Sequence, residues 1–569
     1  MKRHWLFILA WSVGPLLAGC TTQHYRASAD KETAAIIADK SPAVPNMDRH
    51  FTIEQTNAWS FDGLPVSTNW FEYLGADGQA EIGAHVLSLE QSLDFAVKYS
   101  RQYQMRKEQV YLSALTLTLA RNQFTPLFSG RAQAAYQVNT EEVRVVVDAL
   151  TGQPRVLAAQ DALLVDQHRV TAQSSLGVNL LLRSGARLSA AFTTDFLRYL
   201  TGDPRAFANS QLGAQLSQPL WRGRGYKVTM ENLTQSERTM LYALRDFTRY
   251  RKDFSVQVAT AYYGVLGNRD QALNNWNGYQ SAQKNAERTR AFVKEGRTRL
   301  GELGRLEQQE LTSEAAWINA VRSYKQSLDN FKILLGLPVQ ANLVLDSREL
   351  AGLKLLHPTV DLPEASEVAL TMRLDYLNQK DTLEDTTRRV QVAADGLKAQ
   401  IDLVASAGIN SPIEAGRVLA VPDPARYHWD AGLNVDLPFE RTAQRNAYRA
   451  ALIANKQAER ELAGLADTIR SQVFDNWRFL EQARRDYEIS ELTVQLSERR
   501  VEEQDLLAQL DRGVAKDQVD AQNDLINARN GRTRAIIAHT IARLQFWNNL
   551  GILYIKENGR WEETQMAKP

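Results

Sequence analysis

Two aspartates near the C-terminal end of the chain have the type and spacing that most suggest chemistry. Asp517 and Asp520 stand three residues apart in the stretch KDQVDAQNDL. On a helix this spacing places both carboxylates on one face. Neighbouring carboxylates attract cations and hinder anions, although such a pair on a helix is also an ordinary solvated face. The pair therefore predicts either a cation-selective surface or a wet helix face.

The other reactive side chains form no catalytic pattern. The sequence contains no phosphate-binding loop, no His-Glu-x-x-His and no nucleophile elbow. Its eight histidines are scattered without the spacing of metal ligands. His428 lies among the polar residues of an alternating stretch, so we expect it to face water rather than to catalyse. We expect a protein that is not an enzyme and that needs neither a cofactor nor a metal.

Composition and the N-terminal residues restrict the compartment. The chain has 569 residues and a net charge of +1, which gives no reason to expect a nucleic acid as a partner. After Lys2, Arg3 and His4 comes the apolar run WLFILAWSVGPLLAG. This run is too short for a membrane-spanning helix, and we interpret residues 1–19 as a secretory signal.

The signal segment ends in Leu-Ala-Gly-Cys, and Cys20 is the only cysteine of the chain. This ending resembles the lipobox of bacterial lipoproteins, which implies that Cys20 carries lipid and becomes the first residue of the mature protein. Thr21 follows it, not Asp, and in enterobacterial lipoproteins an Asp there favours the inner membrane. The resemblance therefore points to the outer membrane. With a single cysteine, no disulfide can form within the chain.

The elements that position the aspartates are expected to be very long helices. Residues 220–337 and 439–568 contain no proline, and a proline inside a helix costs about 3 kcal/mol. Apolar residues recur in both at steps of three, four or seven, as on one helix face. We predict two long helices at 226–295 and 440–511, two shorter ones after them at 298–335 and 514–550, and two before the strands at 88–125 and 365–400.

Alternating apolar and polar residues predict strands. We expect them at 128–139, 211–218, 401–410 and 427–437, with a possible extra hairpin at 176–192 inside a long insertion, 140–208. The same alternation fits a soluble sheet with one wet face or the wall of an outer-membrane barrel. Pro219 and Pro438 follow two of these strands, and a proline cannot donate to a sheet ladder. They mark the expected junctions between strand and long helix.

The two halves of the chain repeat the same order of elements. The interval from Pro219 to Pro438 is nearly the same as that from Gly336 to Gly551. We interpret this as duplication of a large unit. The predicted parts are a signal peptide at 1–19, an N-terminal extension at 20–87, a first repeat at 88–337, a linker at 338–364, a second repeat at 365–552 and a C-terminal tail at 553–569. The extension lacks clear periodicity, so it either wraps the helices or stays mobile.

Residues 88–552 resemble the TolC family of outer-membrane efflux proteins. The resemblance is carried by SQPLWR and LPFER at the two prolines, by LKAQIDLVASAGI at 397–409, by the tip glycines Gly296 and Gly513, and by the closing words LLG and NLG. It implies a mostly α fold with a membrane β-barrel portion, in which three copies form one α-barrel/β-barrel duct.

The resemblance also implies a function and partners. The family would make this chain a homotrimeric, passive exit duct in outer-membrane lipid, with its helices in the periplasm. Its partners would be a periplasmic adaptor and an inner-membrane pump, in either efflux or type I secretion. The alternative is a coiled-coil lipoprotein scaffold of the envelope that makes no pore. A scaffold, however, has no need of amphipathic hairpins.

The resemblance implies two sets of site residues. Asp517 and Asp520 resemble the paired aspartates of the family's inner tip, where three copies would form an acidic ring at the periplasmic gate. The helix turns would dock the adaptor, through Val293, Gly296, Arg297, Arg512 and Gly513. Both glycines also suit helix C-caps. The interval from Gly513 to Gly551 is slightly shorter than that from Gly296 to Gly336.

Overall fold

The computed structural model describes residues 21–48, 51–54, 59–68, 70–143, 145–147, 153–156, 158, 163–200, 206–412, 414–415, 420–510 and 512–563. Cys20 and the predicted signal peptide lie outside these residues. The chain forms two compact units. The helical unit comprises Met1–Ala114, Met240–Thr382 and Glu459–Pro569, and the strand unit comprises Leu115–Thr239 and Leu383–Ala458.

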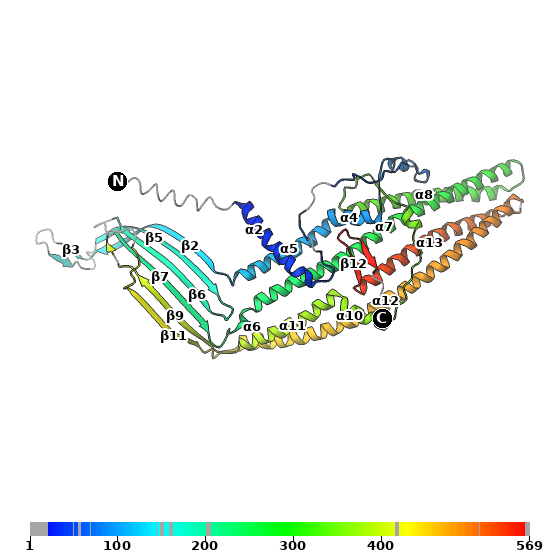
Figure 1. The fold of residues 1–569 in the computed structure, drawn as a ribbon. Coiled ribbons are helices and arrows are strands. Elements are labelled where there is room, and N and C mark those ends of the chain that lie inside the picture. Colours follow the sequence, from blue (N-terminus) through cyan, green and yellow to red (C-terminus); the bar gives the residue numbers. More distant parts are fainter. Residues whose placement is uncertain are drawn as a thin grey trace. The chain divides into compact units, whose positions relative to one another are not determined.

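The strand unit contains one antiparallel sheet in the order β11-β9-β7-β6-β5-β2 (Figure 1). The sheet consists of β2 Leu127–Val143, β5 Leu163–Leu181, β6 Arg187–Tyr199, β7 Ala206–Pro219, β9 Gln400–Asn410 and β11 Tyr427–Asp436. A short strand, β10 Glu414–Ala415, pairs with β7, and β3 Val145–Val147 with β4 Pro154–Val156 forms a separate hairpin. The predicted extra hairpin is β5 and β6, and both belong to the main sheet.

The register of the sheet sorts its side chains into an apolar and a polar face. Successive partners on one face are Phe128, Val178, Ala190, Ala214, Ala407 and Trp429. Successive partners on the other are Arg131, Ser175, Thr193, Gln211 and Asn410. Because side chains alternate along a strand, each predicted apolar series falls on the same side of the sheet.

The helical unit holds most of the long helices. Its main elements are α8 Leu300–Leu335, α13 Ala515–Asn549 and most of α7 Glu231–Lys294 and α12 Thr442–Gln509. A short α6 Tyr226–Thr229 precedes α7. The apolar stripes are buried, as at Met240, Leu244 and Phe254 of α7 and at Ile469 and Val473 of α12. Burial of these stripes stabilises helices that are polar elsewhere.

None of the helices in the described ranges combines the length and the apolar character that crossing a membrane requires.

The helices predicted at 88–125 and 365–400 are each broken in two, so those predictions were wrong in part. The first is α4 Leu89–Tyr99 and α5 Arg101–Asn122, and the second is α10 Leu362–Met372 and α11 Leu374–Asp395. Ser100 and Arg373, at the breaks, have extended backbones with ψ of 124° and 121°. The sequence contains no proline or glycine at either break, which is why helix periodicity alone did not reveal them.

A closing glycine lies against each break. A Cβ atom on Gly336 would stand 2.0 Å from the carbonyl oxygen of Tyr99, and one on Gly551 would stand 3.0 Å from the carbonyl group of Met372. Both glycines also have positive φ, 82° and 80°. Glycine is therefore required at the end of LLG and NLG both for the turn and for the close approach of two backbones.

The described part of the N-terminal extension packs on the helices of the helical unit. It consists of α2 Thr22–Lys40, η1 Ser41–Ala43, η2 Glu72–Leu74, α3 Asp77–Ala80 and β1 His85–Leu87. β1 pairs in parallel with β8 Leu343–Leu345, which precedes α9 Arg348–Ala351. Near the other end of the chain, β12 Leu553–Ile555 pairs with β13 Trp561–Glu563. The Asn46 side chain exchanges two hydrogen bonds, 2.7 and 2.8 Å, with the Ile555 backbone.

Candidate functional site

The first helix tip is a glycine-capped turn. The N–H of Gly296 donates to the Val293 carbonyl at 3.0 Å, and that of Arg297 donates to the Phe292 carbonyl at 2.9 Å. With φ of 75° at Gly296, this is a Schellman cap, and it satisfies carbonyls at the end of α7. The Arg297 guanidinium lies 4.9 Å from the Phe292 ring centroid. Gly296 is thus the helix cap that the sequence suggested.

The second helix tip is built differently. The helix α12 ends at Gln509, and the N–H of Arg512 donates to the Leu507 carbonyl at 2.9 Å. Gly513 has no positive φ, so the prediction that it is a helix C-cap was wrong. Glycine is needed here because there is no room for a side chain: a Cβ atom on residue 513 would lie 2.8 Å from the Cα of Ala508. Close approach of the backbone, not a left-handed turn, explains glycine at this position.

The two tips are joined through the start of α13. Glu302 of α8 accepts a hydrogen bond from the Ala515 N–H at 3.1 Å, which caps the first turn of α13. Beside this contact, Ala286, Leu306 and Ala515 form a buried cluster against which Val519 packs. The first turn of α13 is therefore held in a fixed orientation relative to α7 and α8.

This orientation turns the two aspartates away from the core. Ala515, Gln518 and Ala521 are buried, whereas Asp517 is exposed and Asp520 half-buried. Asp524, one turn further, pairs with Arg500 of α12 at 2.5 Å. Among the described residues, neither Asp517 nor Asp520 has an ion-pair partner. Asp517 also lies in the first turn of α13, where the helix dipole favours a negative charge.

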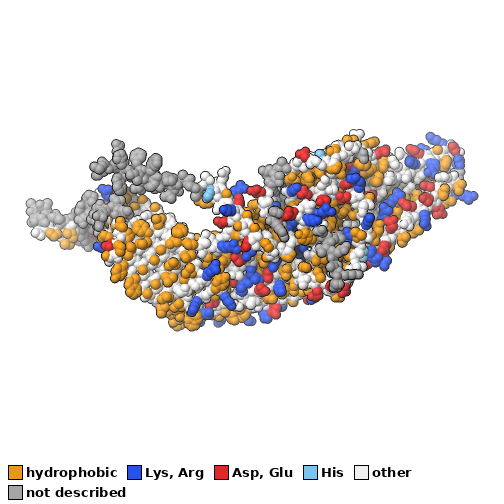
Figure 2. Space-filling model, viewed as in Figure 1, with side chains coloured by type: hydrophobic (Ala, Val, Ile, Leu, Met, Phe, Trp, Pro, Cys, Tyr) orange, Lys and Arg blue, Asp and Glu red, His pale blue; other side chains and the backbone are white. Residues whose placement is uncertain are grey.

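The tips carry both cations and exposed apolar side chains. The exposed cations are Lys294, Arg297, Arg299, Arg512 and Lys516. The exposed apolar side chains are Leu300, Leu506, Leu510 and Val514. Figure 2 shows Lys and Arg side chains gathered where α7, α8, α12 and α13 reach these turns. Of the five residues predicted to dock an adaptor, the structure places Val293, Gly296 and Arg297 on one tip and Arg512 and Gly513 on the other.

The strand-to-helix junctions are held by hydrogen bonds to neighbouring backbone. Pro219 is the last residue of β7, and the next N–H, that of Leu220, donates to the Ile401 carbonyl at 2.7 Å. Pro438 follows β11 by two residues, and its carbonyl accepts from Arg441 Nε at 3.1 Å. Arg441 also donates to the Leu397 carbonyl at 3.0 Å, which explains the arginine after the second proline.

The apolar face of the sheet is exposed. Phe128 is 83 % exposed, Trp429 71 % and Tyr427 70 %. Figure 2 shows a continuous apolar surface over the strands of the main sheet. His428 is on the opposite, polar face, where its Nδ1 lies 3.5 Å from the Asn410 side-chain nitrogen. Its position agrees with the expectation that it faces water.

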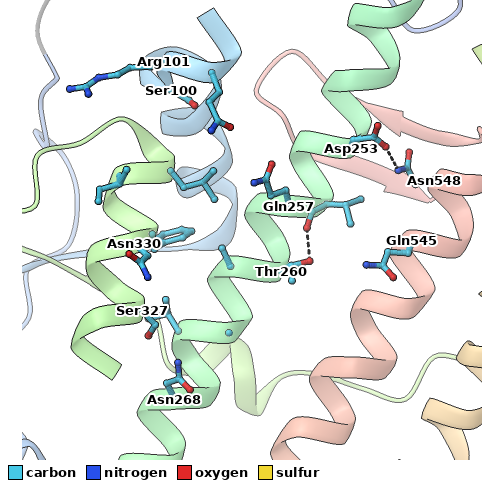
Figure 3. A pocket seen from close by; sticks show the side chains of 18 of the residues that line it. Ser100, Arg101, Asp253, Gln257, Thr260, Asn268, Ser327, Asn330, Gln545 and Asn548 are labelled. Atoms are coloured by element: carbon cyan, nitrogen blue, oxygen red, sulfur yellow. Dashed lines mark hydrogen bonds between the residues drawn. The ribbon is translucent and has the colours of Figure 1, made fainter. Parts of the chain in front are cut away.

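The helical unit also has a groove of about 990 Å³, lined by α7, the end of α8, the end of α13 and the start of α5 (Figure 3). Its polar groups are mainly amides and hydroxyls, and Asn548 donates to Asp253 across it at 2.6 Å. This lining pairs no nucleophile with a base. Within the described ranges, no group of three or more His, Cys, Asp or Glu side chains could hold a metal ion.

Solved structures share this fold. No protein-family model matches the chain, and no curated protein matches it. The Campylobacter jejuni CmeC outer membrane channel superposes with a TM-score of 0.58 at 13 % identity, over 88 % of this chain and 91 % of that one. The open-state Neisseria gonorrhoeae MtrE outer membrane channel gives 0.55 at 14 % identity, over 82 % and 89 %.

A crystal structure of CusC, a protein that forms a transmembrane channel, superposes with a TM-score of 0.57 at 13 % identity, over 88 % of this chain and 98 % of that one. These matches extend over both the helices and the strands, which is the combination that the sequence predicted. The chain therefore has the fold of the TolC-family outer-membrane channels, and the resemblance seen in the sequence is confirmed.

Proposed function

We propose that this protein is a passive outer-membrane exit duct in a tripartite efflux or type I secretion system. Three copies form the duct, lipid on Cys20 anchors it, and its helices reach through the periplasm. A periplasmic adaptor and an inner-membrane pump supply the cargo and the energy. Solved structures with this fold are described as outer-membrane channels, and this supports the proposal.

One observation carries the proposal, namely the sheet with an exposed apolar face and a polar opposite face. A soluble sheet buries its apolar face against another layer. A barrel wall in a bilayer instead turns that face to lipid and the polar face to water. Side chains such as Phe128 and Trp429 are exposed in the single chain and would contact lipid in the duct. A scaffold without a pore would have no use for this arrangement.

Planar bilayers test the duct directly. The purified full-length protein should form trimers in detergent and conduct ions after reconstitution. A protein that stays monomeric and gives no conductance would exclude the duct.

A matched pair of substitutions tests the lipid face. Leu433 of β11 lies on the apolar face, away from the strand ends, and its neighbour Asn434 lies on the polar face. Leu433→Arg should destabilise the assembled barrel by about 2–4 kcal/mol. Asn434→Arg should leave the yield of folded trimer near that of the native protein. Equal yields for both variants would contradict a lipid-facing β11.

We propose that Asp517 and Asp520 form the acidic ring of the periplasmic gate. Three copies bring six unpaired carboxylates together, and such a ring attracts multivalent cations. Asp517→Asn with Asp520→Asn should weaken block of the channel by multivalent cations. Asp524→Asn is the control, because it also removes a carboxylate from this helix, but one that is already paired with Arg500. Unchanged cation block in the double variant would exclude the acidic gate.

We also propose that the tips dock the adaptor. Exposed cations beside exposed leucines favour a partner whose own tips combine carboxylates with apolar residues. Arg297→Glu with Arg512→Glu should reduce the amount of adaptor that purifies with the duct from native membranes. Arg322→Glu, an exposed position elsewhere on α8, is the control. Equal recovery of the adaptor with all three proteins would place docking elsewhere.

A further inference from the structure

We infer that each copy contributes six strands to the barrel, so that three copies close a wall of 18 strands, with β11 of one copy paired to β2 of the next. This inference rests on the proposed trimeric duct. It assigns the hairpin β5–β6 to the membrane wall instead of to an extension outside it. It also identifies the partner of each free sheet edge as a second copy of this chain.

The two edges of the sheet are free to pair. Among the described strands, β2 pairs only with β5 and β11 only with β9. An edge strand in a bilayer leaves backbone N–H and C=O groups without partners, and membrane sheets avoid this by closing. No other described segment of this chain covers either edge. Copies of the same sheet supply the missing ladder.

The strand directions fit this closure. All five neighbouring pairs of long strands are antiparallel. Six strands that alternate in direction leave β2 and β11 running oppositely. When copies are placed side by side, β11 of one therefore meets β2 of the next as an antiparallel pair. The ladder then continues around the wall without a parallel pair at any junction, as in other outer-membrane barrels.

The side-chain faces fit it as well. Tyr427, Trp429 and Leu433 of β11 lie on the apolar face, and so do Phe128 and Tyr136 of β2. When β11 of one copy joins β2 of the next, the apolar face continues from copy to copy. A hairpin that projected outside the membrane would not need to keep this face in register with its neighbours.

The hairpin β5–β6 is inside the wall and not beside it. β2 pairs along its whole length with β5, and β6 pairs with both β5 and β7. The chain therefore passes from β2 to β7 only through two further strands. Phe192 and Leu176 of this hairpin continue the apolar row that Leu212 and Ile409 extend across β7 and β9.

The strand number sets the width of the exit. Barrel diameter grows roughly in proportion to strand number, and barrels of 16–18 strands leave an aqueous channel. The polar face, with Arg131, Thr193 and Gln211, would line this channel. The outer end of the duct would then be wide enough for an aqueous channel.

Cysteine cross-linking tests the junction between copies. Gln133→Cys on β2 is combined in turn with His428→Cys, Asp430→Cys and Asn434→Cys on β11, all on the polar face. Oxidation of the trimer in membranes should give reducible dimers and trimers for at least one of the three pairs. Thr193→Cys on β6, combined with the same β11 positions, is the matched control and should give none. The native chain, with Cys20 alone, supplies the background.

Removal of the hairpin tests the strand number. Tyr136 and Ala206 occupy the same row of the sheet, linked through Val170 and Arg198. Deletion of residues 137–205, with a two-residue Asn-Gly turn in their place, leaves four alternating strands with their faces matched. The largest polymer that enters the outer end of the reconstituted channel should then fall in diameter by about a third.

The outcomes separate this inference from the proposed function. A conducting trimer that gives β2–β11 cross-links, and that admits only smaller polymers after the deletion, supports both the duct and the 18-stranded wall. A conducting trimer that gives no β2–β11 cross-link, or cross-links from β6, overturns the 18-stranded wall and leaves the duct standing. An unchanged polymer cutoff in a conducting deletion variant also overturns it. Loss of trimer and conductance in the native protein overturns the duct itself.

Discussion

The two halves of the chain carry different polar clusters at corresponding positions. The first cluster is Arg269, Tyr324 and Glu81, and the second is Arg484, His539, His357 and Glu481. Arg484 follows Arg269 by the same interval at which His539 follows Tyr324. Gly551 follows Gly336 by this interval too. The two halves therefore place a polar cluster at the same point of the helices, but the charged groups of the two clusters are neutralised in different ways.

The first cluster is a closed, fully paired network. Arg269 contacts Glu81 at 2.9 Å, and its Nε donates to the Tyr73 hydroxyl at 2.8 Å. The Tyr324 hydroxyl donates to the other Glu81 oxygen at 2.8 Å, and burial holds the pKa of Tyr324 well above its usual range. The guanidinium lies 4.7 Å from the Phe71 ring centroid. The network fastens the N-terminal extension to α7 and α8.

The second cluster leaves a histidine buried and neutral. His539 is fully buried, and its Nδ1 has no hydrogen-bond partner among the described residues. Its Nε2 lies 3.4 Å from His357 Nδ1, and His357 Nε2 lies 3.1 Å from Glu481. Burial, with the nearby charges of His357, Arg543 and Arg484, lowers the pKa of His539 to about 4. The position of a buried tyrosine in one half, Tyr324, is thus taken by a buried, proton-sensitive histidine in the other, His539.

The largest expected difference between the halves concerns their closing glycines. Gly336→Ala forces a Cβ into the Tyr99 carbonyl, whereas Gly551→Ala meets Met372 at a distance that a small shift relieves. We expect Gly336→Ala to cost more than about 4 kcal/mol and Gly551→Ala about 1–3 kcal/mol. Thermal unfolding followed by helix circular dichroism measures both. Equal losses would show that the two breaks pack with equal tightness.

The second largest expected difference in stability is between the two arginines, Arg269 and Arg484. Arg269→Met leaves Glu81 buried without its partner and should cost about 3–5 kcal/mol. Arg484 is more exposed, and Arg484→Met should cost no more than about 1 kcal/mol. Urea unfolding of the two variants side by side gives the comparison. A cost for Arg484→Met as large as that for Arg269→Met would mean that the second cluster is also a structural fastening.

Acid should act on the second cluster alone. Since His539 titrates at about 4 when folded and near 6.5 when unfolded, the unfolded chain binds a proton first as the pH falls. Its contribution to stability is present above pH 6.5 and is lost between pH 6.5 and 4, by about 3 kcal/mol. His539→Gln should remove this part of the pH dependence, and Tyr324→Phe should leave it unchanged. The melting temperature from pH 7 to pH 4 provides the measurement.

The smallest predicted difference between the halves lies at the tips. Gly296→Ala places a side chain in open space but keeps a positive φ, so we expect a cost of about 1 kcal/mol. Gly513→Ala presses on the Ala508 backbone and should cost about 1–3 kcal/mol. Hydrogen exchange of the last turn of α12, compared with that of α7, reports the difference. A larger loss of protection for Gly296→Ala than for Gly513→Ala would contradict the view that Gly296 is a helix cap and Gly513 a point of close backbone approach.

The sequence predicted the elements whose signal is local. Long proline-free stripes and strict alternation were enough to find α7, α12 and four of the long strands, because burial follows helix and strand periodicity. The hairpin was predicted only at 176–192, whereas β5 and β6 extend from Leu163 to Tyr199. The prolines marked the junctions, since proline cannot continue the ladder. Because Gly336 and Gly551 occupy matching positions in the two halves, the sequence also predicted that the two closing turns correspond to each other.

Features that depend on contacts between distant segments could not be predicted. The breaks at Ser100 and Arg373 result from packing against glycines that lie far away in the sequence, Gly336 and Gly551, and no local residue marks them. The two clusters join α7, α8, α12 and α13 to segments without periodicity, including the one around Glu81. The difference between Gly296 and Gly513 depends on the path of the turn, which the two glycines themselves do not specify.

The contact between Asn46 and Ile555 has a consequence for the order of events during biogenesis. The two residues are 509 positions apart, and Arg251 also donates to the Lys556 carbonyl at 3.3 Å. Contacts of such sequence separation form late, because the entropy of closing the loop is lost before the contact repays it. The helical unit cannot complete its packing until almost the whole chain has been synthesised. A partly synthesised chain therefore exposes apolar surface that the complete chain buries, and such surface favours aggregation.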